Sequence, residues 1–158
     1  MSKSTADSAD VGAAAAVGAS AAWQEGLRKA VDEANDSIRA VVQEKGDLGI
    51  QQLKGFVAEH WHSGTFNIDA YKKGATDLVA RALDSNSLAS PDVRVFQNGE
   101  PILDVQSKFY GTAKETAAQL WNPDYNTQHK LAPSDQLKDV ISTSELKAAS
   151  VAGTRPHV

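Results

Sequence analysis

The chain has 158 residues, 41% of them hydrophobic and 23% charged, which is typical of a globular protein with room for one domain plus tails. It contains no cysteine, so disulfides, thiol catalysis and thiolate metal sites are excluded. The formal net charge of −4 argues against a general nucleic-acid coat, so any nucleic-acid surface must be a local basic patch.

Residues 1–20 form an Ala-rich leader without hydrophobic periodicity, and we expect them to be disordered. Asp7 and Asp10 precede its apolar stretch, where a secretory signal would have a basic start, so no signal peptide is predicted. No stretch has the apolar length of a membrane span, and we expect a cytoplasmic protein without membrane contact. Residues 21–46 have apolar side chains at three- and four-residue spacing. They predict one amphipathic helix that either packs on the domain or mediates self-association.

Residues 47–149 are expected to form an α+β domain, with a small hairpin-containing sheet flanked by helices, and residues 150–158 a flexible tail. Helical patterns run through residues 47–61 and 69–83, separated by a predicted break at residues 62–64. A loop is expected over residues 84–91.

Asn98-Gly99 is the strongest turn signal in the chain, because tight hairpin turns require positive φ angles at their centre. It predicts antiparallel pairing of residues 93–97 with residues 102–108. A further helix is expected from Thr112, whose spacing to Glu115 is that of a capping box. A short strand is expected to begin at Leu131, and a last helix is expected from residue 134.

Asp104, Gln106 and Lys108 alternate along the second arm of the predicted hairpin, so on a strand they point to one face. Asp92, in a Pro-Asp dipeptide, precedes the first arm, and Glu59 lies upstream on a predicted helix. This pattern resembles the active-site motif of the PD-(D/E)XK nuclease superfamily, in the variant with Gln-X-Lys on the second strand. The resemblance covers about residues 47–121.

The resemblance implies a magnesium site and phosphodiester hydrolysis. Mg²⁺ prefers hard oxygen ligands, which Asp92 and the amide oxygen of Gln106 could supply, with Asp104 as a third candidate metal ligand. Lys108 would orient or deprotonate the attacking water, and Glu59 would hold a metal-bound water from a second position. The catalytic candidates are therefore Asp92, Gln106, Lys108 and Glu59.

The register of the hairpin decides which acid meets Gln106. A two-residue loop pairs Gln97 with Glu100 and places Asp92 opposite Val105, so that Asp104 becomes the nearest acid. A three-residue loop with a bulge pairs Asp92 with Gln106 and aligns the site.

Histidines suggest a second kind of site, because His60 and His62 flank Trp61 next to Glu59, and His129 lies in a later loop. Zinc could bind such a cluster, but His-X-His brings both rings to one side only when the segment is extended. Surface or helix-capping roles are the alternative.

The leading functional hypothesis is a metal-dependent nuclease, with DNA as a more favoured substrate than RNA. The alternative is a non-enzymatic interaction protein that uses the N-terminal helix and the hairpin domain to bind a partner. Nucleic acid could bind a local basic patch around the hairpin, and the chain could work as a homodimer or as part of a larger chain. The residues of that patch would be Lys72, Lys73, Arg94, Lys108, Lys114 and Lys130.

Overall fold

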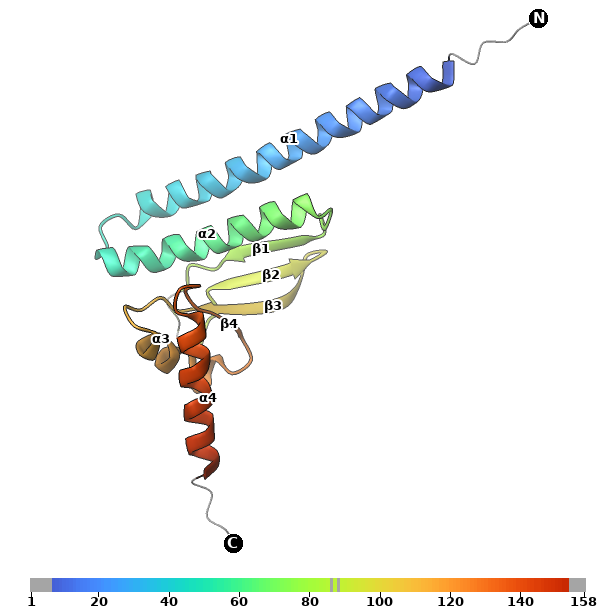
Figure 1. Cartoon of the computed structure of the whole chain (residues 1–158). Helices are drawn as coiled ribbons and strands as arrows, with labels where there is room; N and C mark the ends of the chain where they lie inside the picture. The colour runs from blue at the N-terminus through green and yellow to red at the C-terminus, as the bar shows by residue number, and fades with distance from the viewer. Residues whose placement is uncertain (1–6, 86, 88, 154–158) are drawn as a thin grey trace, which may run out of the picture.

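The computed structural model describes residues 7–85, 87 and 89–153 (Figure 1). Its elements, in chain order, are α1 (Asp7–Glu44), α2 (Ile50–Lys72), β1 (Leu78–Ala82), β2 (Val93–Gln97), β3 (Glu100–Ser107), α3 (Ala113–Leu120), a 3₁₀ turn (Pro123–Tyr125), β4 (His129–Leu131) and α4 (Leu137–Gly153). The predicted α+β class is confirmed.

The four strands form one mixed sheet in the order β1-β2-β3-β4, in which the first three are antiparallel and β4 runs parallel to β3. Helix α2 lies between α1 and the sheet (Figure 1). Phe66 of α2 packs on a core of small and branched side chains from the strands. The buried members of that core are Ala80, Val93, Val95 and Val105. A second cluster joins α3 to α4 beyond β4, through Ala117, Leu120 and Val140.

Helix α1 is longer than the sequence predicted, because it begins at Asp7 and includes most of the expected disordered leader. Alanine has the highest helix propensity, so an Ala-rich stretch can extend a helix that is already formed. Residues 1–6 lie outside the described part of the chain. The N-terminal half of α1 extends past the end of α2 (Figure 1). No helix in the described part of the chain, α1 included, has an apolar stretch that could cross a bilayer.

The predicted break at residues 62–64 is wrong, because α2 continues through it as one helix. The small residues there serve the contact with α1: a Cβ on Gly64 would lie 2.7 Å from the Cβ of Ala34. The Thr65 hydroxyl donates to the carbonyl of Trp61 at 2.8 Å, so it bonds within the helix rather than ending it. Helix α1 thus packs against α2 rather than standing apart.

The predicted helix over residues 69–83 is also wrong, because α2 ends at Lys72 and Leu78–Ala82 is a strand. Gly74 takes a φ of +75°, which other residues rarely adopt, and it ends the helix as a C-terminal glycine does. Asn67 then binds the outer edge of β1. Its amide donates to the carbonyl of Ala80 at 3.0 Å, and its oxygen accepts from the Ala80 N–H at 2.7 Å.

The predicted hairpin and the helix start at Thr112 are confirmed. The Thr112 hydroxyl accepts from the N–H of Glu115 at 3.3 Å and donates to its carboxylate at 2.9 Å. The expected short strand ends at Leu131, and α4 begins at Leu137 rather than at residue 134.

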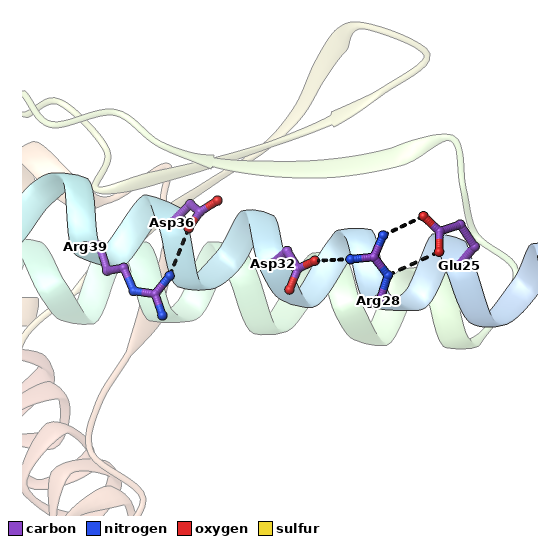
Figure 2. Close-up of polar contacts among 5 residues, drawn as sticks. All are labelled: Glu25, Arg28, Asp32, Asp36 and Arg39. Carbon is purple, nitrogen blue, oxygen red and sulfur yellow. Dashed lines mark hydrogen bonds and ion pairs between the residues drawn. The ribbon is translucent and has the colours of Figure 1, made fainter.

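Charged side chains on the exposed side of α1 are paired along the helix (Figure 2). Arg28 binds Glu25 at 2.6 Å and Asp32 at 2.8 Å, and Arg39 binds Asp36 at 3.1 Å. These charges therefore face water, while Val41, on the packed side, is 3% exposed.

Candidate functional site

The hairpin combines the two registers that the sequence allowed. Asn98 and Gly99 both have positive φ angles, +51° and +86°, and form a two-residue turn that pairs Gln97 with Glu100. The register then shifts between Val95 and Phe96, because Ile102 is an extra residue on β3. Beyond this bulge Val93 pairs with Val105, and continuing that register brings Asp92 beside Gln106.

Asp92 is held by three donors from the end of β3. The Gln106 amide donates to Asp92 Oδ2 at 2.6 Å, and Ser107 donates to the same oxygen from its N–H at 2.7 Å and its hydroxyl at 3.0 Å. Gln106 is 1% exposed, and both it and Ser107 are buried. Neutral donors therefore fix the position of the Asp92 carboxylate without neutralising its charge.

A cavity of about 720 Å³ brings three of the predicted residues together. Glu59 comes from α2, Asp92 from the segment before β2, and Lys108 from the residue after β3. The wall between them is built by side chains of the α1–α2 connection and the first turns of α2, and by one residue of the 84–91 loop. Its other lining residues include Glu44, Lys45, Asp47, Phe56 and Ser85.

Glu59 is placed among like charges. The pKa of Glu59 is raised from 4.5 to about 8, first by burial and then by the carboxylates of Asp92 and Asp84, while Lys108 and Lys45 oppose the shift. A second carboxylate in the same cavity thus disfavours the ionised form of Glu59. A perturbed acid in a cleft beside a second acid and a lysine is the kind of cluster that active sites contain.

Lys108 lies over a neighbouring aromatic ring, with its Nζ 5.1 Å from the centroid of Tyr125. The backbone N–H of Lys108 donates to the carbonyl of Leu131 at 3.1 Å, so β4 holds the backbone of this residue in place. Tyr125 is buried, and its pKa is raised by burial and by the nearby carboxylate of Asp92. The lysine is thus ordered between the sheet end and the cavity.

Two predicted site residues lie elsewhere. Asp104 forms an ion pair with Arg94 at 2.6 Å, in the register pair Arg94↔Asp104, and it does not line the cavity. Gln106 lies behind Asp92, with its NH₂ directed to the carboxylate. Its Oε1 is buried and has no hydrogen-bond partner among the described residues. The amide therefore positions Asp92 instead of facing the cavity with its oxygen.

The residues at the cavity can supply a magnesium ion with only a few protein ligands. Among the residues that the structure describes, no three His, Asp and Glu side chains lie close enough to form a metal site. Mg²⁺ is commonly bound by one or two carboxylates, with waters and substrate phosphate completing its shell. Asp92 and Glu59 fit that description, and a cation would relieve the repulsion between them.

His60 and His62 bind different partners, and with His129 they form no metal-binding group in the described part of the chain. His60 lies between the Ser37 hydroxyl at Nδ1 and Asp84 at Nε2, and thereby connects α1, α2 and the 84–91 loop. The ring of His62 stacks on Phe109 with centroids 5.5 Å apart, and burial lowers its pKa. His129 is exposed on β4. These contacts are structural, and they give no geometry for zinc.

Sequence reasoning missed two residues of the site: Ser107, which donates to Asp92, and Lys45, which lines the cavity. Ser107 was passed over because strict alternation would direct it away from Gln106, but Val105, Gln106 and Ser107 are all buried at the end of β3. Lys45 lies in the last turn of the helix predicted over residues 21–46, where a basic residue is explained by the helix end alone. No local pattern in the sequence could show that the α1–α2 connection reaches the end of the sheet.

Comparisons with protein-family models, with curated proteins and with solved structures gave no match to this chain.

Proposed function

We propose that this protein is a cytoplasmic, metal-dependent nuclease that hydrolyses phosphodiester bonds, with DNA as a more favoured substrate than RNA. One observation carries the proposal: Glu59, Asp92 and Lys108 come from three separate segments and line one cavity. The bulge at Ile102 and the donors from Gln106 and Ser107 position Asp92 there. Two acids and a lysine are the groups that the resemblance to the PD-(D/E)XK superfamily calls for.

The reaction would join a water oxygen to phosphorus and break the bond to one ester oxygen, which leaves with a proton. Lys108 can donate hydrogen bonds to the attacking water or to a phosphate oxygen and so orient them. Glu59, with a pKa of about 8, can give or take a proton near neutral pH. Asp92 stays fixed by its three donors while these groups act.

Magnesium would be held by Asp92 and Glu59. When bound, it would supply positive charge that stabilises the developing charge on the phosphate oxygens. It would also favour the ionised form of Glu59, because a nearby cation lowers the pKa of a carboxyl group. Titrating Mg²⁺ against the protein should therefore release protons near neutral pH, and Glu59→Gln should remove that release.

The decisive experiment compares two aspartates close together on the hairpin. Asp92→Asn and Lys108→Met should each reduce Mg²⁺-dependent cleavage of DNA by ~10²-fold or more, because each removes a group from the cavity. Asp104→Asn is the matched control and should change the rate by less than about threefold, since Asp104 faces Arg94. Thermal melts would verify that all three variants fold. Equal losses in Asp92→Asn and Asp104→Asn would contradict the proposal.

The interaction-protein alternative is supported by a separate apolar groove of about 670 Å³ on another side of α2. Ile50 and Trp61, which line it, are 63% and 57% exposed. Exposed apolar surface of this kind often marks a binding site for another protein. If the purified protein cleaves neither DNA nor RNA with Mg²⁺ or Mn²⁺, the interaction-protein alternative is the better-supported function.

A further inference from the structure

Lys45 is an unusual lysine because its side chain is only 16% exposed and it lines the same cavity as Glu59, Asp92 and Lys108. It belongs to the connection between α1 and α2, so it reaches the cavity from a segment that the superfamily resemblance does not cover. Lysine is rarely buried, since its ammonium group loses hydration there. Its place in the cavity therefore needs an explanation.

Two neighbours of Lys45 contact its ammonium group, and Lys45 itself lines the cavity. Its Nζ lies 4.7 Å from the centroid of the Phe56 ring and 3.1 Å from the carboxylate of Glu44. Glu44 is 73% exposed, so water screens its carboxylate and weakens this ion pair. The ammonium group has three N–H donors, so Glu44 does not saturate it.

We infer that Lys45 forms a phosphate-binding subsite for the backbone of a nucleic-acid strand, alongside Lys108. This inference rests on the proposed nuclease function and adds a binding residue to it. A phosphodiester that entered a cavity lined by Glu44, Asp47, Glu59 and Asp92 would meet four acids and two lysines. The two lysines supply the positive charge that a strand needs in order to approach the carboxylates.

Lys45 is a positioning residue in this scheme, because it holds a phosphate and takes no part in bond breaking. Backbone phosphates are the same in every sequence, so the contact carries no base preference. Removing it should weaken binding uniformly and raise KM more than it lowers kcat.

The test uses the full-length chain and a pair of lysine variants matched in charge. Lys45→Met keeps most of the stem beside Phe56 and removes the positive charge. Lys54→Met is the control. It also removes one positive charge, but from the apolar groove on another side of α2. Fluorescein-labelled single-stranded and duplex oligonucleotides of two unrelated sequences are titrated in EDTA, at several salt concentrations, and anisotropy is measured.

Lys45→Met should weaken binding about 5- to 10-fold for both sequences and lower the salt slope of log Kd by ~0.7–0.9, the value of one phosphate contact. Lys54→Met should stay within about twofold of the wild type, and Lys45→Arg should retain most of the affinity. If Lys45→Met unfolds, Lys45→Gln is measured in its place. Equal affinities of the Lys45 and Lys54 variants would overturn the inference.

The two proposals can fail separately. A wild-type protein that cleaves DNA while Lys45→Met binds as tightly as Lys54→Met keeps the nuclease and removes the Lys45 subsite. A wild-type protein that does not cleave but loses oligonucleotide affinity specifically in Lys45→Met keeps the subsite and removes the nuclease. A wild-type protein that neither cleaves nor binds the oligonucleotides removes both.

Discussion

Two regions of the α1–α2 pair treat charge in opposite ways. Over residues 25–32, in the middle of the helix, α1 carries exposed carboxylates and a guanidinium group that pair along its surface (Figure 2). Where α1 turns into α2, Glu59 and Asp92 are brought into one cavity with Lys45 and Lys108. The first arrangement satisfies each charge locally. The second places Glu59 beside another carboxylate that disfavours its ionisation, an arrangement that is common at functional sites.

The largest change in stability is expected where the two helices touch. Gly64→Ala places a Cβ 2.7 Å from the Cβ of Ala34, and neither atom belongs to a flexible side chain. The helices must separate, which should cost about 1–3 kcal/mol in the free energy of unfolding, measured by urea denaturation. The cavity residues on the α1–α2 connection would shift with α1.

A matched control for this change lies in the same helix. A Cβ on Gly55 meets nothing within 4 Å, so Gly55→Ala should stabilise the protein by up to about 1 kcal/mol, through helix propensity alone. If Gly64→Ala were as stable as Gly55→Ala, α1 would not be held against α2 as described, and the contrast between the two regions would lose its basis.

The next prediction concerns the buried carboxyl group. The pKa of Glu59 is 4.5 in its ordinary state and about 8 in the fold, so between these values the folded chain keeps a proton that the unfolded chain releases. The contribution of Glu59 is therefore fully present below pH 4.5 and is lost as the pH rises towards about 8. Urea denaturation at several pH values should show stability falling over this range, and Glu59→Gln should flatten the profile. A wild-type profile that rises there, or one that Glu59→Gln leaves unchanged, would contradict the assignment.

The smallest effect is expected in the region of paired charges. Arg28 is exposed and lies beside Glu25 and Asp32, whose charges are hydrated with or without it. Arg28→Ala should leave the urea midpoint almost unchanged, and the small difference should vanish at high salt. A large loss of stability would mean that the exposed ion pairs of α1 carry more of the fold than their exposure indicates.

Local signals in the sequence predicted the parts of the fold that depend on local chemistry. The Asn98-Gly99 turn and the Thr112 helix start follow from backbone angles and from one side-chain hydrogen bond, and both are present. The helix break at residues 62–64 was wrong because a small residue can mark either a turn or a close helix contact. Only the position of Ala34 on another helix decides between them.

The sequence predicted which residues belong to the candidate site more readily than it predicted the role of each residue. The resemblance to the PD-(D/E)XK superfamily predicts Glu59, Asp92 and Lys108 as site residues, and these three share a cavity. Gln106 and Asp104 were named with them, but one supports Asp92 from behind and the other pairs with Arg94. These roles depend on register and on facing charges, which lie outside any single segment. Lys45 gave no signal, because its approach to the cavity depends on how α1 packs.

The extra residue in β3 shows how a site can depend on chain length. Ile102 is 53% exposed, and its side chain offers no group for catalysis or metal binding. Its presence nevertheless brings Asp92 beside Gln106 instead of Val105, beyond the five register pairs that follow the turn. Alanine scanning would pass over this position, since alanine preserves the residue count. Only a deletion or insertion in the arm would reveal it, so the number of residues between the turn and Gln106 belongs to the description of the site as much as the residues themselves.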